Sequence, residues 1–470
     1  MSNGKENLLS VVVVGAGVAG LSTAWLISES ARKMGRQIHL RVLEAGTRHG
    51  GATRTDLIEG YLCEWGPNGF LDNEPATLDL IKSLGLESEL VRASDASSRR
   101  YIYHTGKMHE MPMTPPTFLK SDIVPLSAKL RMVLEILIPS RKDDVDETVR
   151  SFGERRLGKS FTNYLLDPMI SGIFAGNIGE LSLKAVFPKM VEMESEYGGL
   201  FRALIAKQRA ARKKGVKAGG PAGPGATLHT FRHGMGQLTD ELARRVGASI
   251  RLEFEVKSVE RFEGKFIVRT DGETFTADVV VLAIPSYAAA EVVQSISPLV
   301  AEALRDIPYA PVDVICNWYA EGQLSDPLNG FGVLIPRSEG VRSLGALWSD
   351  RIFPGQAPAG KRLLRSIIGG AHDYKIAGLS EDKLNGISRS DNAKVMGVNG
   401  APEFSKTFRH ARGIAQYNVG HLDRVAKLDK LEQELPGLFF TGAAYRGVSV
   451  NGIAKDAYRV ASLALKDQVS

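Results

Sequence analysis

The sequence has 470 residues, a length that favours two to four domains. Hydrophobic residues make up 43% and charged residues 24%, which is typical of a globular protein and does not suit a disordered chain. The formal net charge of +6 is mildly basic, suits a phosphate-bearing cofactor or an acidic substrate, and is too small to indicate a nucleic-acid-binding protein.

Several kinds of protein are excluded before any motif is considered. The N-terminus has no basic flank with an apolar core, so no secretory signal is expected, and no uncharged apolar stretch is long enough for a transmembrane helix. Cys63 and Cys316 are far apart in the chain, which excludes a disulfide framework and favours a reducing compartment. The histidines show no metal-ligand spacing, so we expect no metal site. We expect a cytoplasmic protein, with a peripheral membrane contact left open.

The first predicted element is a buried parallel strand over Leu9–Val14, because five of its six residues are apolar. A glycine-rich turn follows, a helix begins near Val18, and His39–Glu44 has the pattern of a second strand. Glu44 stands 24 residues after Gly20, where a carboxylate can accept hydrogen bonds from ribose hydroxyls. This order predicts a Rossmann-like dinucleotide-binding unit.

Three glycines in the turn have G-x-G-x-x-G spacing. Gly15 permits a tight turn, Gly17 leaves room for a pyrophosphate beside the backbone, and Gly20 lets the helix pack close to the strand. The helix N-terminus then offers free N–H groups to the phosphates. A plain strand–turn–helix without a ligand is the alternative interpretation.

The middle of the chain is predicted to be mainly helical from about residue 77 to residue 208. The segment Lys207–Ala218 is basic and Gly219–Ala226 is rich in glycine and proline, so we expect a mobile surface loop there. The six basic residues of 207–217 could attract anionic lipid, although such a run is more often solvated.

The second half of the chain is predicted to alternate between strands and turns. Antiparallel strands are expected over 250–259, 265–270 and 275–282, with Asp271-Gly272 as a hairpin turn. Further strands are expected over 312–319, 332–335, 343–348, 363–368 and 438–441. A last helix is expected near 453–465, after a turn that contains glycine.

Three further segments carry a resemblance to the flavoprotein amine oxidase superfamily. They are EAGTRHGGATRT from Glu44, YLCEWGPNGF from Tyr61, and FTGAAYRGVSVNGIAKDA from Phe440. The first contains Arg48, a potential bidentate phosphate donor, and a pair of adjacent glycines. The last is similar to the helix N-terminus that this superfamily directs at the flavin ring, where a positive end stabilises reduced flavin.

The resemblance implies a non-covalent FAD, because no cysteine follows Cys316 to form the covalent link of monoamine-oxidase-like enzymes. It implies that Val256 lies in the strand that touches adenine. The cofactor-binding residues that it implies are Gly15, Gly17, Val18, Ala19, Gly20, Glu44, Ala45, Arg48, Gly50, Gly51, Ala52, Thr53, Gly66, Pro67, Asn68, Val256, Gly442, Val448, Ser449 and Val450.

Over nearly its whole length the chain resembles the oxygen-dependent protoporphyrinogen oxidase family. The segments that carry this resemblance are RRYIYHTGKMHEMP, SGIFAGNIGELS, GFGVLIP, LGALWSDRIFP, IIGGA and QYNVGHLDRV. The family's substrate is a reduced tetrapyrrole with apolar faces and two propionates, which suits an apolar slot with a cation at its mouth.

The resemblance implies a set of substrate-binding residues. Arg100 matches a propionate-binding arginine, and Gly172 keeps the backbone thin so that its carbonyl can meet a pyrrole N–H. The full set is Arg100, Gly172, Phe174, Leu334, Leu347 and Ile367, with Met113 as a further lining residue. Ile367 stands where plant relatives have an aromatic residue. An ordinary strand core is the alternative interpretation of the three aliphatic positions.

The implied reaction needs few groups from the protein. It removes hydride from the substrate to the flavin in three cycles, with dioxygen as acceptor and hydrogen peroxide as product, in haem and porphyrin biosynthesis. Orientation and electrostatics come from the protein, and the redox step comes from the cofactor. We assign no catalytic acid, base or nucleophile.

The fold class that we predict is α/β. It has a Rossmann-like FAD-binding domain, a mixed-sheet substrate domain, and a helical domain whose membrane association is left open. The predicted boundaries are 1–80, 227–290 and 430–470 for the FAD-binding domain, 81–208 for the helical domain, 209–226 for the loop and 291–429 for the substrate domain.

Three other functions stay open from the sequence. The nearest is oxidation of coproporphyrinogen III, which carries four propionates. The second is another flavin oxidase, such as an amine oxidase or a carotenoid desaturase. The third is a flavoprotein without redox turnover, acting as a scaffold at the membrane. A homodimer is also left open.

Overall fold

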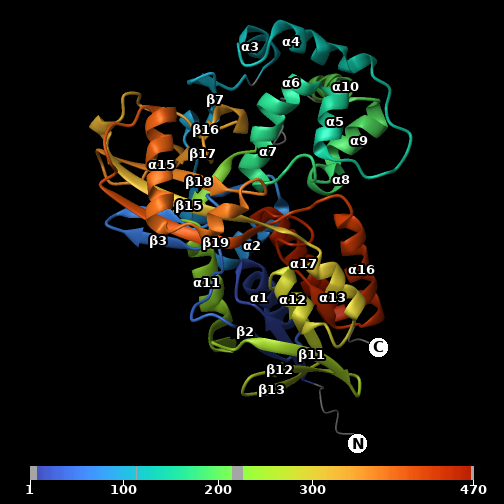
Figure 1. Ribbon diagram of the computed structural model, residues 1–470. Helices are drawn as coiled ribbons and strands as arrows, with labels where there is room; N and C mark the ends of the chain where they lie inside the picture. Colours follow the sequence, from blue (N-terminus) through green and yellow to red (C-terminus); the bar gives the residue numbers. More distant parts are fainter. Residues whose placement is uncertain (1–7, 113, 214–225, 467–470) are drawn as a thin grey trace, which may run out of the picture.

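The computed structural model describes residues 8–112, 114–213 and 226–466. Figure 1 shows three regions: a lower α/β region that contains both chain ends, a sheet region at the upper left and a group of helices at the upper right. The predicted α/β class, with a Rossmann-like unit and a mixed sheet, is confirmed.

The lower region is built on a parallel sheet of five strands. Their spatial order is β10 (Ile250–Leu252), β2 (Ile38–Glu44), β1 (Leu9–Val14), β14 (Val279–Leu282) and β20 (Leu438–Phe440). One face packs against α1 (Val18–Lys33), α2 (Pro75–Leu84), α11 (Gly236–Val246) and α17 (Val450–Lys466). Because both faces are covered, consecutive valines of β1 are buried, as in most parallel sheets.

The opposite face of this sheet is covered by a small antiparallel sheet and three helices. These are β11 (Val256–Phe262), β12 (Lys265–Thr270), β13 (Thr274–Ala277), α12 (Ser286–Val292), α13 (Pro298–Arg305) and α16 (His421–Glu434). The single strand predicted over 275–282 is wrong, since it divides into β13 and β14 (Val279–Leu282) of different sheets. The single strand predicted over 250–259 is also wrong: it divides into β10 and β11, which belong to different sheets. Between them Glu253 has φ = +63°, a turn that the alternating pattern does not indicate.

Two smaller sheets connect the lower region to the rest. One is the hairpin of β3 (Thr55–Ile58) and β4 (Tyr61–Glu64), and the other contains β5 (Phe70–Leu71), β9 (Leu228–Phe231) and β6 (Leu90–Arg92). Short helical turns lie at η1 (Glu87–Glu89), η2 (Asp95–Ser98) and η5 (Gly247–Ser249).

A mixed sheet of seven strands forms the upper left region. Its order is β19 (Phe404–Ala415), β15 (Tyr309–Ala320), β18 (Lys361–Gly369), β17 (Ser343–Trp348), β16 (Gly332–Leu334), β7 (Tyr101–His104) and β8 (Lys107–Glu110). The long helix α15 (Glu381–Met396) lies against it (Figure 1). Shorter turns are α14 (Ser349–Ile352), η6 (Glu321–Gln323), η7 (Arg337–Glu339) and η8 (Tyr374–Gly378). The strands β7 and β8 come from the segment 81–208, so that segment is not helical throughout.

The upper right region consists of helices from that same segment. They are α3 (Pro115–Lys120), α4 (Leu126–Val133), η3 (Leu134–Leu137), α5 (Val149–Arg156), α6 (Lys159–Phe161), η4 (Thr162–Leu166), α7 (Asp167–Phe174), α8 (Leu183–Val186), α9 (Pro188–Tyr197) and α10 (Leu200–Lys213). Arg156 and Glu135 form a fully buried ion pair of 2.6 Å among them. Glu135 also accepts the N–H groups of Leu200 and Phe201, so this pair fixes the start of α10.

The loop predicted from residue 207 starts too early. Helix α10 continues through Lys213, because the sequence KQRAARK consists of strong helix formers. Residues 214–225 of the predicted loop lie outside the described part of the chain.

Two further observations concern the whole of the described chain. None of its helices combines the length and the apolar character that crossing a bilayer requires. Cys63 and Cys316 are both free and buried, and although distant in sequence they share one apolar cluster between β4 and β15.

Candidate functional site

The three glycines of the β1–α1 turn have different surroundings. Gly15 has φ = +99°, and a Cβ there would lie 2.6 Å from the carbonyl oxygen of Ala283. A Cβ at Gly20 would lie 1.9 Å from the carbonyl oxygen of Gly15, so only glycine lets α1 pack this closely. A Cβ at Gly17 would meet nothing nearer than the Cα of Gly51 at 4.0 Å. The open space at Gly17, next to the uncapped N-terminus of the 16-residue helix α1, fits a bound phosphate.

Glu44 ends β2 with a carboxylate that the backbone holds in place. Its Oε2 accepts the N–H of Ala16 at 2.7 Å, and its Oε1 accepts the N–H of Gly46 at 2.8 Å. Each carboxylate oxygen has a second acceptor site, which leaves capacity for sugar hydroxyls. The chain leading to Val256 runs beside this loop, since the N–H of Phe254 donates to the Glu44 carbonyl at 2.8 Å.

The loop after Glu44 lies against the glycine turn. The N–H of Gly50 donates to the carbonyl of Ala16 at 2.9 Å, and Gly50 has φ = +103°. Thr53 is buried, and its carbonyl accepts the hydroxyl of Thr239. Arg48 is exposed and has no ion-pair partner among the described residues. The exposed members of this loop are Ala45, Thr47, Arg48, Gly51 and Ala52.

The segment Gly66–Asn68 approaches that loop from the side of the seven-stranded sheet. A Cβ at Gly66 would lie 2.4 Å from the carbonyl oxygen of Ala52, so these two backbones are in direct contact. Both polar atoms of the Asn68 amide are buried without a hydrogen-bond partner in the described chain. Buried polar atoms are rarely left unsatisfied, and an absent polar ligand explains such a group. Pro67 lies between these two residues.

The C-terminal motif closes the same region. Gly442 has φ = +126°, and the nearest atom to a Cβ there would be the Cβ of Ala19 in α1, at 3.8 Å. Val448 packs against both the core of the lower region and the core of the helices, and Val450 begins the 17-residue helix α17. The Ser449 hydroxyl accepts the N–H of Gly452 at 3.1 Å. The structure therefore brings four separate segments of the predicted cofactor site together around the N-terminus of α1.

Three apolar side chains predicted to touch the substrate share one face of the seven-stranded sheet. Leu334 on β16 pairs with Gly345, which pairs with Ile367 on β18, and Leu347 lies two residues from Gly345. Leu334, Leu347 and Ile367 are half-buried, whereas most of their strand neighbours are buried. Gly172 on α7 opposes them, because a Cβ there would lie 2.6 Å from Cδ2 of Leu334. This face therefore retains exposed apolar surface beside α7.

Arg100 lies at one end of that face. It stands two residues before Ile102, the parallel partner of Leu334, so its side chain belongs to the same side of the sheet. The guanidinium lies over the ring of Phe331, with Cζ 5.0 Å from the centroid. The side chain is exposed, yet desolvation lowers the pKa of Arg100. Arg100 therefore lies in a recess, where its surface is open to solvent but surrounded by protein atoms. Among the described residues, its guanidinium has no hydrogen-bonding or carboxylate partner.

Phe174 does not lie with these residues. Its ring is 6% exposed, packs in the core of the helices and meets the Phe187 ring edge-on at 5.9 Å. It contributes through its backbone instead, since the Phe174 carbonyl accepts the Gln416 amide at 2.9 Å. On α7, Gly172 and Ile173 are exposed instead, and Ile173 is 51% exposed. Met113 lies outside the described residues.

Two buried ionisable groups lie between the cofactor and substrate sides. The resemblance implies that Glu64 lies in a segment near the flavin ring, whereas Arg365 was not predicted as a site residue. Glu64 is 1% exposed and accepts the Thr55 hydroxyl at 2.7 Å and the Met235 N–H at 2.8 Å. Burial raises the pKa of Glu64 to about 7, against these hydrogen bonds and the positive charge of Arg365, which lower it. Arg365 interrupts the apolar run of β18, and a charge inside such a run is the sequence signal that could have identified it.

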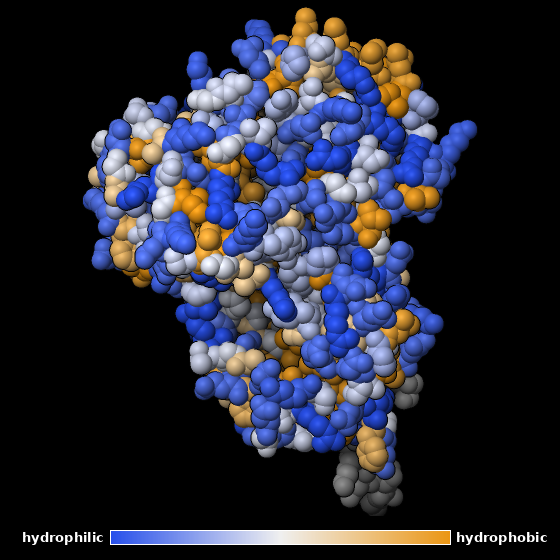
Figure 2. All heavy atoms as spheres, in the orientation of Figure 1, coloured by the Kyte–Doolittle hydropathy of each residue, from blue (hydrophilic) through white to orange (hydrophobic). Residues whose placement is uncertain are grey.

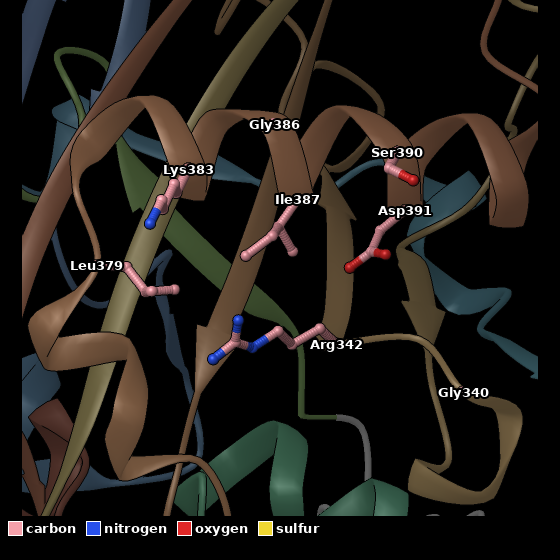
Figure 3. A pocket seen from close by; sticks show the side chains of 8 residues that line it. All are labelled: Gly340, Arg342, Leu379, Lys383, Gly386, Ile387, Ser390 and Asp391. Carbon is pink, nitrogen blue, oxygen red and sulfur yellow. The ribbon is translucent and has the colours of Figure 1, made fainter.

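A surface hollow elsewhere does not form part of this site. Figure 3 shows its lining, with Lys383, Ile387 and Asp391 of α15 above Arg342. Arg342 is held by Asp373 through hydrogen bonds of 2.6 and 3.0 Å, and Asp391 accepts two hydrogen bonds from Ser343. Arg342 and Asp391 are therefore already paired within the protein.

Comparison with known proteins gives consistent matches over the whole chain. The family model for flavin containing amine oxidoreductase matches residues 18–465. A coproporphyrinogen III oxidase of Bacillus subtilis (strain 168) is 30% identical, with 96% of each chain covered. A chloroplastic protoporphyrinogen oxidase of Nicotiana tabacum is 32% identical, with 97% of this chain and 85% of the relative covered. The crystal structure of a candidate protoporphyrinogen oxidase from Exiguobacterium sp. 255-15 superposes with a TM-score of 0.82 at 25% identity, covering 97% of this chain and 99% of that one.

Proposed function

The chain belongs to the family of flavin-containing amine oxidoreductases, and from this premise we propose that it oxidises protoporphyrinogen IX to protoporphyrin IX with dioxygen as acceptor. It is an oxidoreductase, and FAD is its cofactor. The observation that carries the substrate proposal is the partly exposed apolar face of Leu334, Leu347 and Ile367, with the unpaired Arg100 at one end. A reduced tetrapyrrole has matching chemistry, with apolar faces and an anionic edge.

The cofactor would be held largely by backbone groups. The turn at Gly17 and the N-terminus of α1 would take the pyrophosphate, and Glu44 would accept the ribose hydroxyls. The unsatisfied amide of Asn68 and the N-terminus of α17 would face the flavin ring. Bound FAD supplies the two-electron acceptor for the substrate and passes the electrons on to dioxygen.

The protein's own residues would orient the substrate. Arg100 would hold a propionate bidentately, and desolvation in its recess strengthens such a charged pair. The apolar face would exclude water from the macrocycle, while Gly172 keeps α7 thin enough for a pyrrole ring to lie beside it. The Gly172 carbonyl would accept the pyrrole N–H. Three two-electron oxidations remove six hydrogens, so three dioxygen molecules become three hydrogen peroxide molecules.

Anaerobic mixing with protoporphyrinogen tests this function. We expect the oxidised-flavin absorbance of the FAD-loaded protein to bleach within one turnover. Porphyrin fluorescence should appear only after air is admitted, because one FAD accepts two electrons and the full oxidation removes six. Admitting air should restore the flavin spectrum and release hydrogen peroxide in equal amount to the flavin reoxidised. A protein that holds FAD but shows no bleaching with any porphyrinogen would contradict the proposal.

Coproporphyrinogen III is the second candidate substrate. The observation in its favour is the Bacillus subtilis coproporphyrinogen III oxidase, which aligns with 96% of its own length. Its four propionates need more cations than Arg100 alone. Initial rates with the two porphyrinogens under identical conditions decide between them, and the larger kcat/KM identifies the substrate.

A peripheral membrane contact is a further part of the proposed function. Helix α4 and turn η3 expose a stripe of apolar side chains, which are Leu126, Leu130, Val133, Leu134 and Leu137, each 51–71% exposed. Figure 2 shows hydrophobic residues at the top of the molecule, where Figure 1 places α4. Such a stripe inserts into the interfacial layer of a bilayer, which is where an apolar substrate dissolves.

Sedimentation with anionic vesicles tests the contact. We expect binding at low salt that is only partly lost at high salt, because apolar insertion is not screened. A variant with Leu130→Ser and Leu137→Ser should lose the salt-resistant part, whereas Leu57→Ser, at another exposed leucine in β3, should not. Absence of binding at low salt would contradict this part of the proposal.

A further inference from the structure

Arg365 is a buried cation that the proposed function leaves unused. It lies in the middle of β18, where its cross-strand partners are Leu347 on one side and Cys316 on the other. Its side chain is 3% exposed, so it is almost completely removed from water. One guanidinium nitrogen, Nη2, donates to the carbonyl of Gly66, while Nε is buried without a hydrogen-bond partner in the described chain.

No carboxylate lies within ion-pair distance of this guanidinium among the described residues. The ionisable groups around it are Glu64, Cys63, Cys316 and His410. Burial raises the pKa of Glu64 to about 7, so this carboxyl is only partly ionised near neutral pH. Burial lowers the pKa of His410 and so favours its neutral form, which adds no charge of either sign. Leaving a buried cation unpaired is unfavourable, because the group has lost its hydration without gaining a counterion. Negative charge on a bound group would therefore stabilise this buried guanidinium.

A second buried arginine on the same strand is arranged differently. Arg362 is 1% exposed and lies on the opposite face of β18, three residues away. Its Nε donates to Asp350 at 2.7 Å and its Nη1 donates to the carbonyl of Pro327 at 3.1 Å. Arg362 thus has the counterion that a structural arginine requires, and Arg365 does not.

The surroundings of Gly66 indicate where the missing negative charge would come from. The Gly66 backbone contacts Ala52 of the predicted cofactor loop, and the buried Asn68 amide two residues later has no partner for either polar atom. Unsatisfied donors and an unpaired cation therefore border one region, next to the segment expected to meet the flavin ring. Arg365 contacts that segment through its hydrogen bond to the Gly66 carbonyl.

We propose that Arg365 is the fixed positive charge that stabilises the anionic reduced form of the flavin and thereby raises its reduction potential. This rests on the flavin position of the proposed function. A positive charge in a water-poor site favours the reduced, negatively charged state of a nearby group over the neutral oxidised state. The same guanidinium donates a hydrogen bond to the Gly66 carbonyl and so also orients that segment. Arg365 thus has two roles: it sets the reduction potential of the flavin, and it positions the segment that contains Gly66.

Flavin reduction potentials of three FAD-loaded variants test this role. Arg365→Gln removes the charge and keeps a donor for Gly66, and we expect at least a tenfold shift toward oxidised flavin, equivalent to about 30 mV for a two-electron couple. Arg365→Lys keeps the charge and should stay within threefold of the parent protein. Arg362→Gln breaks a buried ion pair on the other face, so it should lower the melting temperature and leave the potential unchanged.

An unchanged potential in Arg365→Gln would overturn the proposal. If that variant does not retain FAD, Glu64→Gln changes the charge next to Arg365 instead. Removing this carboxylate should shift the flavin toward the reduced form at pH 8 and leave it unchanged at pH 5, where the Glu64 carboxyl is already protonated. No shift at pH 8 would overturn the proposal as well.

These potentials do not depend on which substrate is oxidised. A protein that turns over no porphyrinogen, but whose potential falls in Arg365→Gln, would contradict the proposed substrate and support the role of Arg365. If the protein turns over a porphyrinogen but Arg365→Gln leaves the flavin potential unchanged, the proposed substrate is supported and the role of Arg365 is contradicted.

Discussion

In the proposed FAD-binding region, glycines and backbone groups form most of the proposed site. On the seven-stranded sheet, the side chains of three aliphatic residues and Arg100 form the proposed substrate site. At Gly20 a single added carbon would lie 1.9 Å from a backbone oxygen, which cannot move without the strand. At Gly172 the same carbon would meet only the end of the Leu334 side chain, which can rotate. Substitutions in the first region should therefore damage folding and cofactor binding together, and substitutions in the second should damage turnover alone.

The largest effect is expected from Gly20→Ala. The clash with the Gly15 carbonyl separates α1 from β1, so we expect a loss of about 3 kcal/mol of stability and little bound FAD. Gly17→Ala is the matched variant, because its Cβ has 4.0 Å of clearance and should reduce FAD affinity without lowering the melting temperature of the apoprotein. Flavin-to-protein absorbance ratios and thermal unfolding measure both. Equal melting temperatures for the two apoproteins would contradict the distinction.

Glu64 lies where the two regions meet, and it should make stability depend on pH. Its pKa is about 7 in the folded protein against 4.5 in the unfolded chain, so between these values the folded state binds more protons. Stability therefore falls as pH rises through this window, by on the order of 3 kcal/mol in total. In Glu64→Gln this component should vanish. Thermal unfolding of the apoproteins at pH 5 and pH 8 is the measurement, and an identical change in melting temperature for both would refute it.

Gly172→Ala should separate turnover from cofactor binding. The added methyl group narrows the space between α7 and Leu334, so we expect kcat/KM for the porphyrinogen to fall about 100-fold, equivalent to about 2.7 kcal/mol, with full FAD content. Gly386→Ala is the control, since a Cβ on that helical glycine of α15 has nothing within 4 Å. If Gly172→Ala loses FAD and turnover in parallel, Gly172 has only a structural role.

The smallest effect is expected from Arg100→Lys. Lysine keeps the charge but cannot form the bidentate pair with a carboxylate, so KM should rise about tenfold while kcat changes little. Arg99→Lys, at the neighbouring half-buried arginine, is the control. Steady-state kinetics with porphyrin fluorescence measure both variants. An unchanged KM in Arg100→Lys would contradict the assignment of Arg100 to the substrate site.

The sequence predicted most of the lower region because its signals are local. The buried strand Leu9–Val14, the glycine turn and the helix from Val18 lie as predicted, and the end of the predicted second strand at Glu44 is confirmed. The predictions failed where distant segments decide the outcome. Residues 250–259 divide between two sheets, residues 207–213 are helical, and the Phe174 ring packs among the helices.

By itself, the sequence determined the class of the protein, since glycine spacing and strand periodicity depend on backbone geometry within a few residues. Only the tertiary structure decided which side chains share a surface. Leu334, Leu347 and Ile367 are ordinary strand residues in the sequence, and their common face follows from the register of three strands. Arg362 and Arg365 are the same amino acid three positions apart, yet one meets Asp350 and the other has no counterion in the described chain. Burial and pairing depend on what the fold places opposite a residue, and no local pattern contains that information.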